Sequence, residues 1–191
     1  MKLLEDRILS DGEVIGGKIL KVSNFLNHQI DVLFLDRLAE EWKKRFSGSE
    51  ITKVLTIESS GIAIGASLAR ALGVPLVFAK KHQSSNVNEG VHSAKVFSFT
   101  HDQYYNVVVS KKYLTAGEKI LLADDFLANG NALKGLIEIC ESAGCEVVGA
   151  AIAIEKGFQN GGDELRKNGV KVESLAIIEK MDSTGIEFRK E

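Results

Sequence analysis

Cysteine, long apolar runs and blocks of like charge are scarce or absent in this sequence, and each absence excludes a class of protein. Cys140 and Cys145 are too few for a disulfide framework, and their spacing is not that of a CxxC motif. No apolar run approaches the ~20 residues of a membrane span. Residues 1–10 lack the apolar segment of a signal peptide. A cytoplasmic location is therefore the default expectation.

The distribution of charge argues against one kind of partner. The chain has 24 lysines and arginines against 26 aspartates and glutamates, a net charge of −2. Since the basic residues form no stripe along the sequence, nucleic acid is disfavoured as the main partner. With 191 residues, 45% of them hydrophobic and 26% charged, the chain is long enough for one folded domain with a substantial core.

The most informative stretch that is present is ILLADDFLANGNALKG, residues 120–135. Its first four residues, 120–123, are apolar and predict a buried strand. Asp124 and Asp125 follow. Apolar residues then recur at the spacing i, i+3, i+4, i+7, which predicts an amphipathic helix over residues 131–143.

A loop of small and polar residues, 128–132, joins this strand to this helix. The first N–H groups of a helix have no partner within it, and the helix dipole favours negative charge there. Small residues such as Gly130 let a phosphate approach the backbone closely. The two aspartates are suited to accept hydrogen bonds from sugar hydroxyls or to hold a hydrated Mg²⁺. Together these features predict a site for a phosphorylated sugar.

Three further apolar runs are each followed by a polar cluster. Since the carboxyl ends of parallel strands lie along one edge of a sheet, the clusters predict one ligand crevice in an α/β protein with a parallel sheet. Solvated strand ends are the alternative for any single cluster. The runs and their clusters are 54–57 with Glu58-Ser59-Ser60-Gly61, 76–79 with Lys80-Lys81, and 147–154 with Glu155-Lys156.

The remaining segments yield more limited predictions. Residues 2–9 and 62–72 are expected to be helical, and Asp31 is a candidate N-cap for a helix whose apolar face ends at Phe46. Residues 12–19 come close to a Walker A loop, but Ile19 stands where Ser or Thr is needed and no strand precedes it, so we reject that motif.

Two segments leave alternatives open. Residues 18–29 belong to no long periodic element, and their sequence fits a ligand-covering flap and an ordinary edge segment equally well. The polar residues 82–91 precede two strand-like runs, 94–99 and 106–110, which we interpret as a lid built on a hairpin. The alternative is a plain surface hairpin. A strand over 170–178 and a final hairpin strand near 185–188 complete the chain.

The stretch 120–135 resembles the phosphoribosyl-pyrophosphate (PRPP) signature of the type I phosphoribosyltransferases. It departs from the usual pattern at Asn129, Asn131 and Ala132, where Thr, Gly and Thr are common. The run Asp-Asp-Phe-Leu-Ala-Asn-Gly is more similar to the bacterial xanthine phosphoribosyltransferases. The chain from Leu20 through Glu155-Lys156 to the C-terminus also has the length and the motif order of that family.

This resemblance implies a fold and a reaction. The fold is a central parallel sheet flanked by helices, in one domain, 1–191, with a hood from about residues 1–30 and the C-terminal segment, and a lid over about 81–110. The reaction converts PRPP and xanthine into xanthosine 5′-monophosphate and pyrophosphate, with Mg²⁺ bound alongside PRPP. A homodimer is also implied.

The resemblance, read with the chemistry of the residues, also implies a role for each part of the site. Lys156 has three donors and no acceptor, which suits the 2-oxo group of xanthine. The alternative is that Lys156 only pairs with Glu155 or Asp125. Phe126 or Phe158 is expected to pack on the base. The implied roles are catalysis for Asp124 and Asp125; xanthine binding for Leu20, Asn27 and Lys156; PRPP binding for Ala128, Asn129, Gly130, Asn131 and Ala132; and pyrophosphate binding for Ser59, Ser60, Gly61 and Lys80 or Lys81.

Other functions remain as alternatives. An adenine-specific or hypoxanthine-guanine-specific relative would share most of these motifs. A PRPP-binding regulator without catalysis would need a DNA-binding module, and only residues 1–30 leave room for one. A receiver domain also has paired aspartates after a strand, but there the pair comes early in the chain, not at Asp124.

Overall fold

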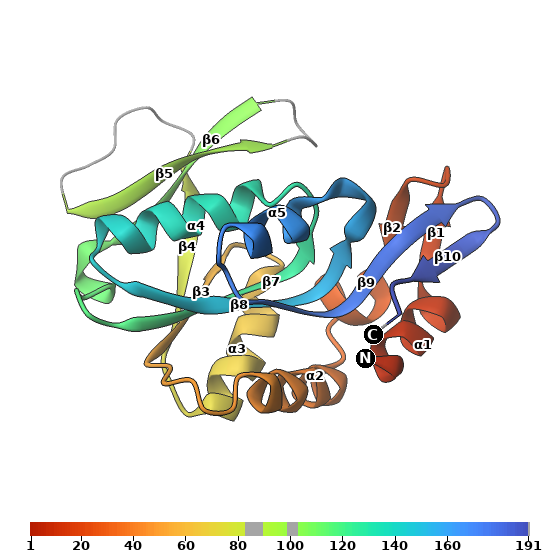
Figure 1. Cartoon of the computed structure of the whole chain (residues 1–191), viewed down its shortest axis with the longest axis horizontal. Helices are drawn as coiled ribbons and strands as arrows, with labels where there is room; N and C mark the ends of the chain where they lie inside the picture. The colour runs from red at the N-terminus through yellow and green to blue at the C-terminus, as the bar shows by residue number, and fades with distance from the viewer. Residues whose placement is uncertain (83–89, 99–102, 191) are drawn as a thin grey trace.

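Within residues 1–82, 90–98 and 103–190, which the computed structural model describes, eight strands form one sheet with helices on both faces (Figure 1). The strand order is β10-β9-β8-β7-β3-β4-β6-β5. The strands are β3 (Lys53–Ile57), β4 (Leu76–His82), β5 (Val91–Ser98), β6 (Gln103–Ser110), β7 (Lys119–Leu127), β8 (Glu146–Lys156), β9 (Val172–Asp182) and β10 (Gly185–Phe188).

The middle of this sheet is parallel, as the sequence predicts. Strand β3 pairs in parallel with β4 and β7, β7 pairs with β8, and β8 pairs with β9. The two edges are antiparallel: β6 pairs with β4 and β5, and β10 pairs with β9. The predicted hairpins therefore form, while residues 83–89 and 99–102 of the expected lid, among them Phe99, lie outside the described residues.

Helices α4 and α5 cover one face of the sheet, and α2 and α3 cover the other (Figure 1). Each face has its own apolar cluster: Trp42 of α2 belongs to one, and Leu136 and Cys140 of α4 belong to the other. Cys140 is thus a core residue, as expected. The helices are α1 (Lys2–Asp11), α2 (Val32–Arg45), α3 (Gly61–Leu72), α4 (Asn131–Ser142) and α5 (Gly161–Lys167), with short helical turns η1 (Ser23–Asn27), η2 (Lys111–Tyr113) and η3 (Gly157–Gln159).

Local sequence signals explain where α2 begins and which face it buries. The Asp31 carboxylate accepts a hydrogen bond of 3.1 Å from the backbone N–H of Phe34, so the predicted N-cap is confirmed. The side chains of the predicted apolar face, up to Phe46 in the turn that follows the helix, are buried. Trp42 also donates its indole N–H to the carbonyl of Glu173, which fixes α2 against β9.

The predicted strand ends are wrong for three strands. Asp124 and Asp125 lie within β7, Lys80 and Lys81 within β4, and Glu155 and Lys156 within β8. The apolar runs end earlier than the strands because a neighbouring strand continues to supply backbone partners. Asp124, for example, lies opposite Ile152 in the ladder between β7 and β8.

Residues before α2 form a small layer of their own beside β9 and β10 (Figure 1). Strands β1 (Glu13–Ile15) and β2 (Ile19–Lys21) pair as an antiparallel hairpin. Its turn, at Gly16 and Gly17, has positive φ angles of 57° and 68°, so the Walker-like stretch is a hairpin turn. A hood made of this layer and the C-terminal segment remains a prediction. No helix in the described part of the chain is long and apolar enough to cross a membrane.

Candidate functional site

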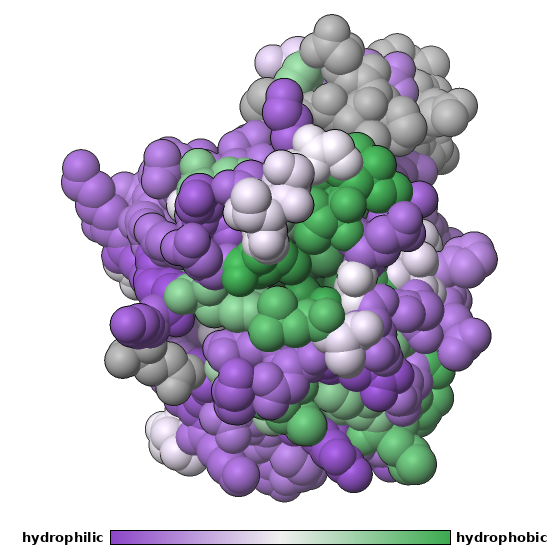
Figure 2. Space-filling model, turned by 90° about the vertical axis from the view of Figure 1, so that its right-hand side faces the viewer, coloured by the Kyte–Doolittle hydropathy of each residue, from purple (hydrophilic) through white to green (hydrophobic). Residues whose placement is uncertain are grey.

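A cavity of about 570 Å³ lies at the carboxyl edge of the sheet. Its walls come from β7, β8, the start of α4, the hairpin β5–β6 and β2. On the side of the molecule that carries β1, β2 and β10, apolar side chains gather in the middle of the surface, with hydrophilic residues around them (Figure 2). The predicted residues that line the cavity are Asp124, Phe126, Ala128, Asn129, Gly130, Asn131, Ala132 and Lys156.

Loop 128–132 forms one side of this cavity, between the end of β7 and the first turn of α4. Gly130 immediately precedes α4 and has φ +78°, a left-handed conformation that glycine adopts without the penalty paid by other residues. The Asn131 amide donates a hydrogen bond of 3.3 Å to the carbonyl of Phe97, so this side chain ties α4 to the hairpin. The loop thus presents the start of a helix to the cavity, as the sequence predicts.

Asp124 is a buried carboxylate that lines the cavity. It is 6% exposed and accepts a 2.9 Å hydrogen bond from the backbone N–H of Asp125. Burial, and then the negative charge of Asp125, hold the pKa of Asp124 well above its ordinary value. A carboxylate in this state is stabilised by a cationic group or a hydroxyl donor placed beside it.

Asp125 connects three parts of the chain. Its carboxylate accepts a hydrogen bond of 2.8 Å from the Asn27 amide in η1 and one of 2.9 Å from the Ser60 hydroxyl in the loop after β3. Two residues predicted for different roles, Asn27 and Ser60, therefore meet at one predicted catalytic carboxylate.

The loop after β3 approaches Asp124 from the other side. The peptide bond between Glu58 and Ser59 is cis. A side chain at Gly61 would overlap the Thr56 hydroxyl and lie 3.2 Å from the Asp124 carboxylate. Only glycine therefore lets the start of α3 come this close to Asp124.

The two lysines of β4 have different surroundings. The positive charge of Lys81 opposes the rise in the pKa of Asp124, and its ammonium lies 5.5 Å from the ring centre of Tyr105, which lines the cavity. The Lys80 ammonium instead lies 6.0 Å from the ring centre of Phe78. Successive residues of a strand point to opposite faces, so Lys81 is the one directed toward the cavity.

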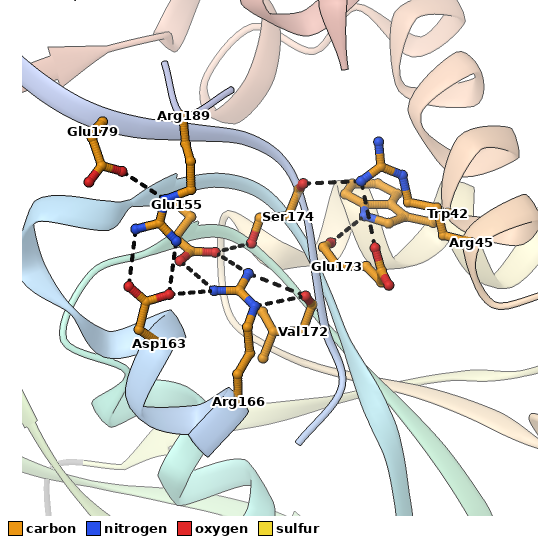
Figure 3. Close-up of polar contacts among 10 residues, drawn as sticks. All are labelled: Trp42, Arg45, Glu155, Asp163, Arg166, Val172, Glu173, Ser174, Glu179 and Arg189. Carbon is orange, nitrogen blue, oxygen red and sulfur yellow. Dashed lines mark hydrogen bonds and ion pairs between the residues drawn. The ribbon is translucent and has the colours of Figure 1, made fainter. Parts of the chain in front are cut away.

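Lys156 lies at the end of β8 and lines the cavity. Its ammonium is 5.8 Å from the ring centre of Phe126, and partial burial lowers its pKa. The alternative pairing with Glu155 is wrong, because Glu155 pairs with Arg166 on the opposite face of the sheet (Figure 3). Glu155 therefore does not belong to the crevice cluster in which the sequence placed it.

Of the other residues expected around a base, some line the cavity and others do not. Leu20 is 6% exposed and belongs to the apolar core, whereas its neighbour Ile19, 55% exposed, lines the cavity. Phe126 lines the cavity, while Phe158 borders a separate groove beside Gly17.

Sequence reasoning missed two polar residues of the cavity wall, Tyr105 and Gln159. The pKa of Tyr105 is raised by burial and then by the negative charge of Asp124. Tyr105 lies inside a hairpin strand and Gln159 in a short helical turn, so neither follows the end of an apolar run. The only available signal was the position of Gln159 shortly after Lys156.

Comparison with known proteins agrees with this geometry. Residues 21–189 match the sequence model of the phosphoribosyl transferase domain, so the chain belongs to the phosphoribosyl transferase family. A curated relative from Clostridium novyi, named xanthine phosphoribosyltransferase, is 54% identical over 189 residues, which are 99% of this chain and 100% of the relative. A protein of the same name from Bifidobacterium adolescentis is 54% identical over 192 residues, with the same coverage.

Solved structures confirm the fold. Adenine phosphoribosyltransferase from Rhodothermus marinus aligns with a TM-score of 0.75 at 22% identity, over 93% of this chain and 100% of that one. The APRTase of Giardia lamblia, complexed with 9-deazaadenine, aligns with a TM-score of 0.76 at 24% identity, over 91% and 96% of the two chains. The chain has the type I phosphoribosyltransferase fold, and a receiver domain is excluded.

Proposed function

We propose that this enzyme transfers the 5-phosphoribosyl group of PRPP to N9 of xanthine and releases pyrophosphate. The observation that carries the proposal is the convergence of loop 128–132, Asp124 and Lys156 on one cavity. In the reaction the bond from C1′ of the ribose to a pyrophosphate oxygen breaks, and a bond from C1′ to N9 forms. The N9 proton passes to solvent.

Loop 128–132 is the proposed site of the 5′-phosphate of PRPP. The first residues of α4 line the cavity, their N–H groups have no partner within the helix, and the helix dipole favours an anion there. The side-chain amide of Asn129 supplies a further donor. Because Asn131 already donates to Phe97, its amide holds the hairpin near this phosphate rather than serving as the main phosphate donor.

Asp124 and Asp125 are the proposed catalytic carboxylates. Departure of pyrophosphate leaves positive charge on the ribose, and preorganised negative groups stabilise that charge most strongly where water is excluded. Both carboxylates are 6% exposed. They would also accept hydrogen bonds from the ribose hydroxyls. Asn27 and Ser60 hold the Asp125 carboxylate in place before the substrate arrives.

The leaving pyrophosphate is assigned to the backbone amides of Ser59, Ser60 and Gly61, with Lys81 directed toward the same region. Lys80 is assigned a smaller role in pyrophosphate binding, because its ammonium lies near the ring of Phe78.

The donor set fits a magnesium ion that PRPP brings with it. The described residues contain no cluster of three carboxylate, histidine or cysteine ligands, so they form no cage that would hold the ion alone. Mg²⁺ prefers phosphate oxygens, water and one or two carboxylates. Asp124 and Asp125 are the residues that would supply those carboxylates, and the bound ion would neutralise charge on the pyrophosphate.

Xanthine is assigned to the part of the cavity between Phe126 and Lys156. An oxo group at position 2 of the purine requires a donor, whereas the amino group of guanine requires an acceptor, and lysine supplies donors alone. The remaining predicted base residues are Leu20, which supports β2 from the core, and Asn27. The hood, the lid, a homodimer and a cytoplasmic location are further parts of this proposal.

A panel of purines tests the proposed function. The purified protein with PRPP and Mg²⁺ is offered xanthine, guanine, hypoxanthine and adenine, and pyrophosphate release is measured. We expect the highest kcat/KM with xanthine. A higher value with another base would assign the enzyme to that base, and PRPP binding without pyrophosphate release from any base would identify a non-catalytic regulator.

A further inference from the structure

Glu155 is a fully buried charged residue that the proposed mechanism does not use. Arg166 of α5 donates two hydrogen bonds to its carboxylate, of 2.9 and 2.7 Å, and the Ser174 hydroxyl of β9 donates a third (Figure 3). Arg166 also donates to the carbonyl of Val172. A buried carboxylate with all its partners in place fixes the elements that supply them, here β8, β9 and α5.

The first turn of α5 touches both this carboxylate and loop 128–132. A side chain at Gly162 would overlap the Glu155 carboxylate. A side chain at Gly161 would overlap the carbonyl oxygen of Ala128 and lie 2.7 Å from the backbone nitrogen of Gly130. The backbone of α5 is therefore packed directly behind the loop, and any movement of α5 changes the space that the loop occupies.

Helix α5 is too short to hold this position alone. It has seven residues, and isolated helices of that length are unstable in water. Its Leu165 is buried, and two sets of ion pairs connect it to the sheet: Arg166 pairs with Glu155 of β8, and Asp163 pairs with Arg189, which also pairs with Glu179 of β9 (Figure 3). An ion pair between Lys134 of α4 and Glu164 is exposed and adds little.

Glu155 also precedes Lys156 in β8. Because successive side chains of a strand point to opposite faces, fixing Glu155 toward α5 directs Lys156 to the other face, where it lies near Phe126. One ion pair thus acts on the phosphate end of the cavity through α5 and on the base end through β8.

We propose that Glu155 and Arg166 are positioning residues, which hold α5 against loop 128–132 and set the direction of Lys156. This inference rests on the proposed function, because it assigns PRPP to the loop and the base to Lys156. Neither residue lines the cavity. Their effect on the reaction is therefore indirect.

The test uses a double variant, Glu155→Gln with Arg166→Met, because removing one partner alone would leave a buried charge unpaired. We expect faster amide hydrogen exchange in residues 128–132 of the ligand-free protein. We also expect the KM for PRPP to rise about 10- to 100-fold, with a smaller change in kcat and a narrower preference for xanthine over guanine. Arg166→Lys keeps the charge but not the two-pronged contact. Its hydrogen exchange in residues 128–132 and its KM for PRPP should therefore lie between those of the double variant and those of the wild type.

Glu118→Gln is the matched control. Glu118 pairs with Lys53 near the starts of β7 and β3. The substitution therefore removes an ion pair that contacts neither α5 nor loop 128–132. It should leave the exchange of residues 128–132 and the KM for PRPP unchanged. A folded double variant with wild-type exchange in residues 128–132 would overturn the inference. Since the exchange measurement needs no turnover, it decides the matter even if the wild-type enzyme fails to use xanthine.

Discussion

The contacts of the two aspartates allow their charge to be tested separately from their geometry. Asp124 accepts one hydrogen bond from a backbone N–H, and Asp125 accepts one each from Asn27 and Ser60. Asparagine has the same shape and retains an acceptor oxygen. Substitution by asparagine therefore removes the negative charge while most of these contacts stay in place.

We expect Asp124→Asn and Asp125→Asn to lower kcat by roughly 10²- to 10³-fold, the usual effect of removing one oriented electrostatic contact. The KM for xanthine should change far less, because the proposed site of the base lies toward Lys156. Steady-state kinetics measures both constants. A wild-type kcat in both variants would mean that the two carboxylates are merely structural.

The pH dependence of the reaction follows from the raised pKa of Asp124. Since burial and Asp125 favour its protonated form, kcat/KM for PRPP should fall on the acid side at a higher pH than an ordinary carboxyl group would give. In Asp125→Asn one of these causes is removed, so the pKa of Asp124 falls and the acid limb should move to lower pH. Asp36→Asn, on the distant α2, is the control. An acid limb that stays in place in Asp125→Asn would contradict this assignment.

At the scale of elements, sequence periodicity identified α1 to α4 and the strands of the large sheet, but it missed α5, the hairpin β1–β2 and the ends of several strands. The apolar run 120–123 is only the first part of the buried segment of β7, because Asp124 and Asp125 are buried as well. The strand itself continues to Leu127 because β8 continues beside it. An apolar run marks only the buried residues that are hydrophobic, whereas the length of a strand depends on its neighbours, so the polar ends of β4, β7 and β8 could not be assigned from local sequence.

The junction between β7 and α4 leads to a prediction about Gly130. A β-branched residue there must adopt φ near +78°, which costs about 1–2 kcal/mol for an L-residue. An added Cβ would make only an ordinary van der Waals contact, at 3.5 Å from Leu165. We therefore expect Gly130→Val to fold and to lose PRPP binding, measured by calorimetry, as its loop backbone shifts.

Gly48→Val is the matched control for this change. Gly48 has φ +87° in the turn after α2, with open space around it, and it lies outside the cavity. Both variants should lose similar stability in a denaturant titration, but PRPP affinity should fall in Gly130→Val alone. Equal PRPP affinity in the two variants would mean that loop 128–132 does not bind the phosphate.

At the scale of the whole molecule, the region proposed for the base draws on residues that are far apart in the sequence. Ile19 comes from β2, Phe126 from β7, and Lys156 from the end of β8. The sequence could predict Lys156, because it follows a long apolar run. It could not predict that Ile19 rather than Leu20 faces the cavity, because the hairpin register and the packing beneath Leu20 decide which residue points outward.

The choice of base therefore tests the whole arrangement. If the Lys156 ammonium donates to the 2-oxo group of xanthine, its loss leaves that acceptor buried and unpaired, which costs roughly 1–3 kcal/mol. The 2-amino group of guanine accepts no hydrogen bond from this lysine, so activity with guanine should fall less when the ammonium is lost. Lys156→Met should therefore lose most of its activity with xanthine and narrow or erase the preference for xanthine over guanine, measured as the ratio of kcat/KM values. Methionine keeps the unbranched chain as far as Cε and therefore its packing near Phe126, and it lacks the ammonium group.

High pH provides a second route to the same result. Because burial lowers the pKa of Lys156, the wild-type enzyme should lose its preference for xanthine as the pH rises through that lowered pKa, and Lys156→Met should show no such change beyond that of the purines themselves. Lys180→Met removes an exposed lysine, one that pairs with Asp182, and should leave the ratio unaltered. If Lys156→Met retains the full ratio at every pH, Lys156 does not recognise the base, and selection must come from Asn27, Gln159 or the backbone around them.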